Sequence, residues 1–180
     1  MDRRNALVML SGMALSTGLL SVTDGALAQT ATPKSGMPAT LGSLQYRKMT
    51  LMAGTFSKQT SQLALTRAGN PKVKEFAGFE ANEQTSIAQV LTDMSNPPPA
   101  PLDGPHQQML QQLTGQSGKA FDTAYVQGQM TGHQELLLIQ QKFLDGMPTN
   151  RNLEHIAVLA RTVINMHLTM LQDLQGMLSS

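Results

Sequence analysis

The sequence predicts an all-α domain, a ferritin-like four-helix bundle, on three observations. Aromatic residues make up only 4% of the 180 residues and Trp is absent, while 13 Met accompany many Gln and Leu. This composition favours helices over sheets. Four long stretches carry apolar side chains at helical spacing. The first and second stretches, and likewise the third and fourth, are joined by short links, whereas a long Pro-rich segment separates the second from the third, which is the connectivity of ferritin-like bundles.

Residues 1–28 have the pattern of a signal peptide. Arg3 and Arg4 give a positive start, residues 6–20 form an apolar run, and Ala26-Leu27-Ala28 is a cleavage site that leaves Gln29 as the mature N-terminus. The protein is therefore expected to be periplasmic or secreted. The alternative is an uncleaved anchor, but the run is short and rich in Gly and Ser, so we expect no stable membrane span after signal removal. The arginine pair loosely resembles a twin-arginine signal.

The bundle domain is expected over residues 41–178, after a flexible leader at 29–40. The first helix spans about Leu41 to Ala68 and ends at Gly69. Asn70 is an N-cap and Pro71 a first helical residue for a second helix, which continues to about Met94. A link this short makes the two helices antiparallel neighbours.

The segment from Ser95 to Gly118 is the long connection. Its prolines between residues 96 and 101 exclude a helix, and Pro105 to Leu113 forms a short one. Extended residues at about 3.3 Å each, followed by a few helical turns, could cross the bundle from end to end. The alternative is an up-down-up-down bundle in which the Pro-rich piece is only a surface loop.

The third helix begins at Ser117 or Lys119 and continues to Leu144. Gly128 and Gly132 on its apolar side would let a neighbouring helix approach closely. Asn150 caps the fourth helix, which continues to Leu178. The third and fourth helices form the second antiparallel pair.

Polar residues interrupt the apolar face of each long helix near its middle. In helices of similar length packed side by side they would form one layer, made of Gln59, Thr60, Glu80, Gln84, His133 and His167. A buried carboxylate needs a partner, so we expect Glu80 to contact His133, on the flank of the third helix, or His167, in the apolar stripe of the fourth. Three interpretations stay open: a structural layer that sets helix register, a metal or ligand site, and a helical phase that leaves some of these residues facing solvent.

The layer lacks the ligands of a di-iron site, which needs a Glu from each of two helices and Glu-x-x-His from each of the others. The first helix has no Glu, and His133 and Glu135 of the third cannot both face the core. The candidate ligands for Zn²⁺ or a similar divalent ion are His133, His167, Glu80 and Glu83. A second possibility is Cu(I) held by Met166, His167 and Met170, with Met130 at the same level, although Met is also a common core filler.

The remaining polar residues have plainer interpretations. His106 is expected in a solvated loop and His155 exposed in the first turn of the fourth helix, while Asp122 and Asn150 are expected to be caps or surface groups. A net charge of +1 and the absence of phosphate-loop or nucleophile-elbow patterns give no support to nucleic-acid, nucleotide or hydrolase functions. Without Cys there is no disulfide or thiolate ligand.

A family resemblance rests on residues of all four helices, most specifically Phe121-Asp122, Tyr125 and His133. The further matching positions are Leu63-Ala64, Asn70, Val73-Lys74, Phe76-Ala77, Gln129, Ala157 and His167-Leu168. Over residues 44–178 the chain resembles the exported bacterial family called domain of unknown function 4142. The resemblance implies a ferritin-like four-helix bundle in the periplasm or outer membrane.

The chain departs from that family's pattern in two helices. The family usually has Asp-His in the second helix and a Glu in the first, where this chain has Glu83-Gln84 and Ser57 or Gln59. The histidines of the third and fourth helices remain. We therefore expect an exported, non-enzymatic binding, scaffold or envelope-stress protein with a protein or small ligand as partner; the alternative is a degenerate ferritin-like metal binder.

Overall fold

The computed structural model describes residues 37–94 and 100–180, which contain five α-helices and no strand. All five helices belong to one compact unit, Ala31–Ser180. The predicted signal peptide, residues 1–28, and most of the predicted leader lie outside the described residues. The prediction of an all-α fold is confirmed, and none of the described helices is long and apolar enough to cross a membrane.

Helices α1 (Ser43–Arg67) and α2 (Pro71–Asp93) are joined by a three-residue turn. The Asn70 side chain accepts a hydrogen bond from the Lys72 N–H at 2.8 Å, which is the expected N-cap. Asp122 of a distant helix accepts the backbone N–H groups of Gly69 and Asn70 at 3.0 and 2.8 Å. Asp122 is therefore not a surface group. It is buried and caps the turn between α1 and α2.

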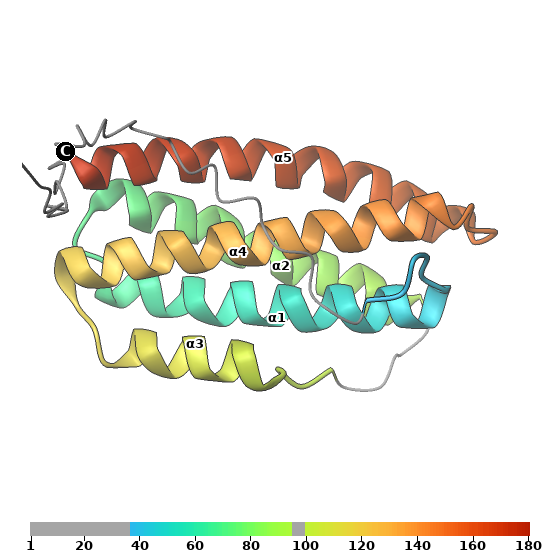
Figure 1. The fold of residues 1–180 in the computed structure, drawn as a ribbon, viewed down its shortest axis with the longest axis horizontal. Coiled ribbons are helices and arrows are strands. Elements are labelled where there is room, and N and C mark those ends of the chain that lie inside the picture. The colour runs from blue at the N-terminus through green and yellow to red at the C-terminus, as the bar shows by residue number, and fades with distance from the viewer. Residues whose placement is uncertain (1–36, 95–99) are drawn as a thin grey trace, which may run out of the picture. The chain divides into compact units, whose positions relative to one another are not determined.

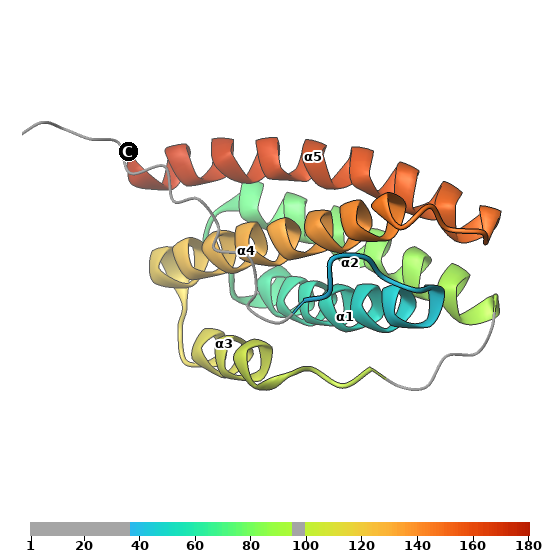
Figure 2. The same cartoon turned by 45° about the vertical axis from the view of Figure 1, so that its right-hand side comes forward.

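The short helix α3 (Gly104–Thr114) lies in the connection between α2 and the third long helix, α4 (Gly118–Asp145), where the sequence predicts it. Asp103 caps it by accepting the His106 N–H at 3.1 Å. Figures 1 and 2 show α3 alongside α1, outside the long helices. Leu113 is buried, and the sulfur of Met109 lies 3.0 Å from the position that a Cβ on Gly128 would take. Gly128 thus permits the close approach of α3.

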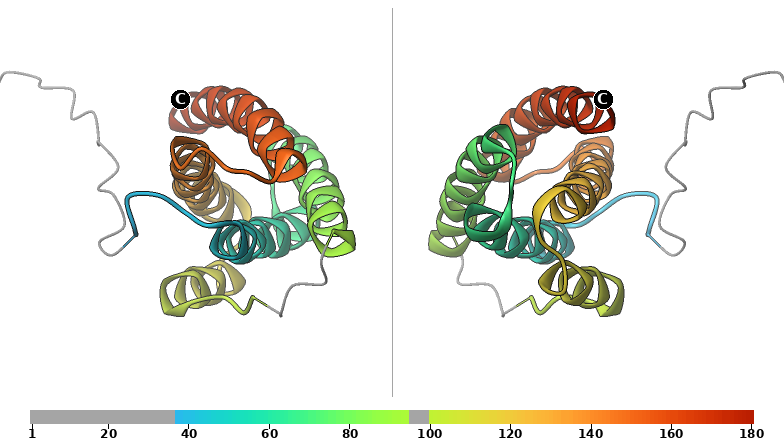
Figure 3. Two further views of the ribbon diagram at one scale, coloured as in Figure 1. Left: turned by 90° about the vertical axis from the view of Figure 1, so that its right-hand side faces the viewer. Right: turned by 90° about the vertical axis from the view of Figure 1, so that its left-hand side faces the viewer.

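Helices α4 (Gly118–Asp145) and α5 (Arg151–Ser179) form the second pair. Gly118 opens α4 at φ +59°, a conformation that favours glycine. Asn150 caps α5 by accepting the Leu153 N–H at 3.2 Å, as predicted. The end-on views in Figure 3 show α1, α2, α4 and α5 around a shared interior, with α3 outside them. The fold is a helical bundle.

Two apolar clusters fill this interior at opposite ends of the long helices. One, which we call the turn cluster, lies beside the α1–α2 turn. It includes Ala64, Phe76, Phe121, Tyr125 and Leu171. The distal cluster includes Tyr46, Leu91, Ile139, Phe143 and Leu153. The mid-helix polar residues of α2, α4 and α5 lie between the two, so the apolar clusters hold the candidate site from both sides.

Candidate metal site

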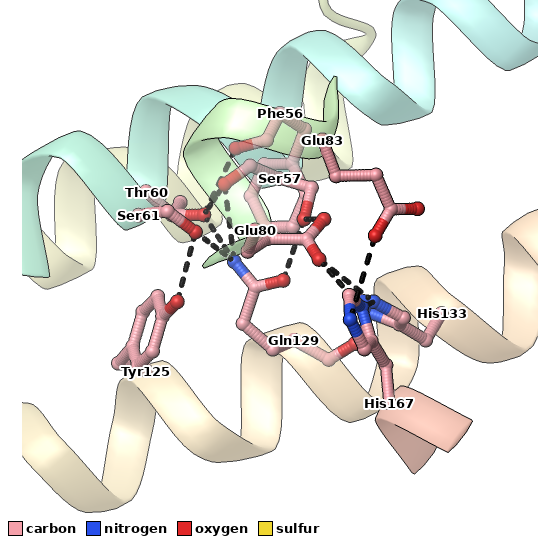
Figure 4. Close-up of polar contacts among 10 residues, drawn as sticks. All are labelled: Phe56, Ser57, Thr60, Ser61, Glu80, Glu83, Tyr125, Gln129, His133 and His167. Atoms are coloured by element: carbon pink, nitrogen blue, oxygen red, sulfur yellow. Dashed lines mark hydrogen bonds and ion pairs between the residues drawn. The ribbon is translucent and has the colours of Figure 1, made fainter. Parts of the chain in front are cut away.

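Three buried side chains from three helices meet between the clusters. Glu80 comes from α2, His133 from α4 and His167 from α5, and as whole residues they are 0%, 0% and 3% exposed. Glu80 Oε2 lies 3.2 Å from His133 Nε2 and 2.9 Å from His167 Nδ1, and the two ring nitrogens are 3.2 Å apart (Figure 4). The expected contact of Glu80 with a histidine is present with both, and His133, which we placed on the flank, is fully buried.

The spacing of these atoms suits a small divalent ion. Zinc binds histidine nitrogen and carboxylate oxygen at about 2.0–2.1 Å, so two ligands of a tetrahedral ion stand about 3.3 Å apart. The three observed separations, 2.9 to 3.2 Å, are shorter by a few tenths of an ångström at most. Two imidazoles and one carboxylate fit such an ion and leave a fourth position for water or another ligand.

The backbone of α4 orients His133. Its Nδ1 lies 2.8 Å from the Gln129 carbonyl oxygen one turn earlier, and only an N–H can donate there. One proton therefore occupies Nδ1. His133 donates to Glu80 only when Nε2 is protonated as well, and loss of that second proton frees the Nε2 lone pair for a metal ion. Fixing the tautomer through the second ring nitrogen is the usual arrangement of metal-binding histidines.

Glu83 lies behind His167 rather than among the three. Its Oε2 is 3.4 Å from His167 Nε2, the ring nitrogen that faces away from Glu80. The predicted set of four candidate ligands therefore separates into three converging residues and one outer carboxylate. A carboxylate on the far nitrogen of a ligating histidine orients the ring and increases its basicity.

A hydrogen-bonded network joins the second oxygen of Glu80 to α1 (Figure 4). Ser57 Oγ lies 2.5 Å from Glu80 Oε1 and 2.6 Å from Gln129 Oε1, so its single proton serves two acceptors. The Gln129 amide also donates to Thr60 Oγ1 at 2.7 Å. Neither Ser57 nor Gln129 was predicted from the sequence to belong to the site. Their spacing was the available signal, because Gln129 precedes His133 by one helical turn and Ser57 precedes Thr60 by three residues.

The charges in the site shift its pKa values. Burial alone would raise the pKa of Glu80, but hydrogen bonds from His133 and His167 outweigh it, so the net shift is downward. Burial alone would lower the pKa of His133, but the hydrogen bond and charge of Glu80 raise it overall. Burial and the charge of Glu80 raise the pKa of Glu83. Glu80 is therefore the anion around which the site is built.

Other members of the expected polar layer lie elsewhere. Gln59 is exposed on the outer side of α1, as the third interpretation of the layer allowed, whereas its neighbour Thr60 is buried. Gln84 is buried against α1, with its Oε1 2.5 Å from the position that a Cβ on Gly54 would take. The buried polar layer therefore contains fewer residues than the sequence suggested.

His106 is a second correction, because it is buried rather than solvated. Its Nδ1 lies 2.6 Å from Asp103 Oδ1 and its Nε2 lies 3.3 Å from Glu135 Oε2 of α4. Its ring packs on Phe56 of α1 at a centroid distance of 4.6 Å. Glu135 thus faces α3 while His133 faces the core, as expected of neighbours that cannot share a face. His155 is exposed, also as expected.

The three methionines of the Cu(I) alternative divide between the surface and the core. Met166 is 53% exposed. Met130 and Met170 pack against the turn cluster. The structure thus places Met166 at the surface and accounts for the other two as core fillers, the alternative interpretation of these residues.

Fold and site together define a class, the helical bundle with a buried histidine–carboxylate cluster. The family model described as "Domain of unknown function (DUF4142)" matches residues 22–174, so the chain belongs to this family and the resemblance is confirmed. A solved structure, "CopM in the Cu(II)-bound form", is similar to the chain with a TM-score of 0.67 and 14% sequence identity. The likeness covers 76% of this chain and 97% of that one, and at this identity it shows the fold alone. No curated protein matches.

Proposed function

We propose that this protein is an exported, periplasmic metal-binding bundle in which Glu80, His133 and His167 hold one divalent transition-metal ion. The observation that carries the proposal is the convergence of three buried ligand atoms from three helices on one point. We propose a binding role without catalysis, since the cluster found among the described residues offers one carboxylate and two histidines where a di-iron centre needs the larger set. The short, long and short connections support a ferritin-like four-helix layout.

Zinc and Cu²⁺ are the ions that the donor set favours. Two histidines and one glutamate are a familiar zinc set with one open position, and Cu²⁺ exceeds Zn²⁺ in affinity for nitrogen and oxygen ligands. The similar solved structure contains Cu(II), which makes that ion a candidate here. His133 and His167 each have a hydrogen-bond acceptor behind the ring, Gln129 and Glu83, as metal ligands usually do.

A structural polar layer is the competing account of the same contacts. Glu80 already meets two imidazoles and the Ser57 hydroxyl, so the cluster is satisfied by hydrogen bonds alone. In that account the protein acts through a protein or small-ligand partner, and the cluster only sets helix register. The two accounts differ in whether the protein retains an ion.

Metal analysis of the mature protein tests the proposal. The protein is purified without chelator or metal-affinity resin, dialysed against Zn²⁺ or Cu²⁺, dialysed again without metal, and analysed for elements. We expect about one ion per chain, and loss of that ion in the His133→Ala, His167→Ala double variant. The control is His155→Ala, which removes an exposed histidine of α5. A double variant that keeps its full metal content would refute the proposed ligands.

Export is tested separately. The expected mature N-terminus is Gln29, and N-terminal sequencing of the protein from a periplasmic extract checks it. A chain that retains Met1 and fractionates with the cytoplasm would overturn the proposed location, but it would leave the metal proposal standing.

A further inference from the structure

Glu83 is the member of the site region that meets solvent. The side chains of Glu80, His133 and His167 are 0%, 1% and 4% exposed, whereas Glu83 is 21% exposed. Its carboxylate reaches the outer nitrogen of His167, whose other nitrogen belongs to the buried triad. A chain of ligating atoms therefore leads from the surface to the buried site through two residues.

Glu83 also lines a groove between α2 and α5. The groove has a volume of about 300 Å³ and apolar walls, formed mainly by Ile87 and Val90 of α2 and by Ile156, Leu159, Ala160 and Val163 of α5. Of the described residues that line it, Glu83 alone is charged. The groove surface is almost wholly apolar, so Glu83 lines it mainly with its aliphatic part, and its carboxylate is the charge that attracts a cation approaching there.

We propose that the α2–α5 groove is the loading route of the metal site and that Glu83 is its capture ligand. This inference rests on the proposed function. A hydrated divalent cation reaches Glu83 along the groove, binds Glu83 and His167, and passes to the triad. His133 and Glu80 take no part until that last step, because both are fully buried.

The geometry of the outer pair supports capture. Glu83 Oε2 and His167 Nε2 are 3.4 Å apart, close to the spacing of about 3.3 Å expected for two ligands of one tetrahedral ion. Neutral His167 offers Nε2 as a ligand when its proton is on Nδ1 and donated to Glu80. Passage to the triad exchanges these roles, so that Nδ1 binds the ion and the proton moves to Nε2 beside Glu83. Replacing bound waters in two steps avoids exposing a bare ion to the apolar interior, where desolvation is costly.

The test is the rate at which the full mature apoprotein takes up Zn²⁺, followed by stopped flow against a chromogenic chelator. Glu83→Gln keeps the size and the hydrogen-bond acceptor of the side chain but removes its charge. We expect zinc uptake and release both to slow at least about tenfold, with one ion still bound per chain and an affinity within a fewfold of wild type. The matched control, Glu154→Gln, alters a partly exposed glutamate of α5 that pairs with Arg151 and should leave both rates unchanged.

A second variant tests the groove without altering a ligand. Val163→Phe partly fills the groove, and the control Val158→Phe adds the same bulk on an exposed face of α5. We expect Val163→Phe to slow uptake and release together and Val158→Phe to leave them unchanged.

Several results would overturn the inference. Wild-type rates in Glu83→Gln would remove Glu83 from the route, and a weaker affinity caused by faster release alone would make it a supporting residue of the triad instead. Loss of stoichiometric zinc in Glu83→Gln would make it a ligand. A wild-type protein that binds no zinc would overturn the proposed function and this inference with it, so the two failures are distinct.

Discussion

The His167 ring has a carboxylate at each nitrogen, Glu80 on the buried side and Glu83 on the groove side. An aliphatic residue at this place in the α5 stripe would complete the apolar interior, yet the chain puts an imidazole there. In the apoprotein the imidazole satisfies Glu80, and with metal bound it would be a ligand. One substitution separates these roles.

We expect His167→Leu to fold as an apoprotein within about 1 kcal/mol of the wild-type apoprotein and to lose its metal. Glu80 keeps His133 and Ser57 as partners, so no unpaired charge is buried, and an apolar side chain suits a site packed against Phe76. Urea unfolding of metal-free proteins and elemental analysis check the two halves. Retention of stoichiometric metal would exclude His167 as a ligand.

The three converging residues could be predicted from sequence because Glu80 and His167 interrupt an apolar face at mid-helix and His133 lies at the same level on the flank of its helix. Spacing could place Ser57 and Gln129 on buried faces, but it could not assign their contacts, because a small or amide side chain gives no sign of which acceptor it will meet. His106 was misjudged for a related reason. His106 follows a proline in a connection that has the composition of a loop. The α4 carboxylate that it contacts, Glu135, is far away in the sequence.

At the scale of the helices, residues at their ends decide where each begins. Asn70 and Asn150 cap α2 and α5 as the sequence predicts, since this capping depends only on local geometry. Asp122 caps the α1–α2 turn from α4, and no local pattern could reveal that contact. The helix boundaries were therefore predictable, whereas the contacts that hold one pair to the other were not.

Gly118 gives a test of helix initiation. It opens α4 at φ +59°, where a Cβ is unfavourable, so we expect Gly118→Ala to lower the free energy of unfolding by about 1 kcal/mol. Gly104 opens α3, and no atom of the described residues lies within 4 Å of the position that a Cβ would take there, so Gly104→Ala should be neutral or slightly stabilising. Chemical denaturation of both variants checks this. Equal effects would mean that the backbone conformation at Gly118 is not required.

His106 makes the attachment of α3 depend on pH. Burial lowers its pKa, but hydrogen bonds and charges from Glu135 of α4 and Asp103 of α3 raise it overall. A raised pKa means that the stabilisation is fully present below the unfolded value of about 6.5 and is lost as pH rises through the folded value. Phe56 of α1, which packs on the ring, is uncharged.

We therefore expect His106→Gln to cost about 2 kcal/mol near pH 5.5 and clearly less near pH 9. Urea unfolding at the two pH values measures the difference. His155→Gln, at an exposed position, should stay within about 0.5 kcal/mol of wild type at both. A His106→Gln cost that is equal at the two pH values would contradict the role of its charge.

At the scale of the whole molecule, two apolar clusters enclose one buried polar layer, formed by Glu80, His133 and His167. Burying a carboxylate and two imidazoles there costs desolvation, which hydrogen bonds offset in the apoprotein and an ion would offset further. The all-α class could be predicted from the helical spacing of the apolar residues. The position of the polar layer could be predicted from the midpoints of the helices. The α2–α5 groove could not, because it depends on how far apart two helices pack.

The measurement that tests the central claim most directly is an anomalous diffraction map of crystals of the mature protein loaded with Zn²⁺. We expect one strong peak within about 2.2 Å of Glu80 Oε2, His133 Nε2 and His167 Nδ1. A triad without a peak, with the ion instead at surface residues such as His155 or Met166, would contradict the account and leave the cluster a structural polar layer.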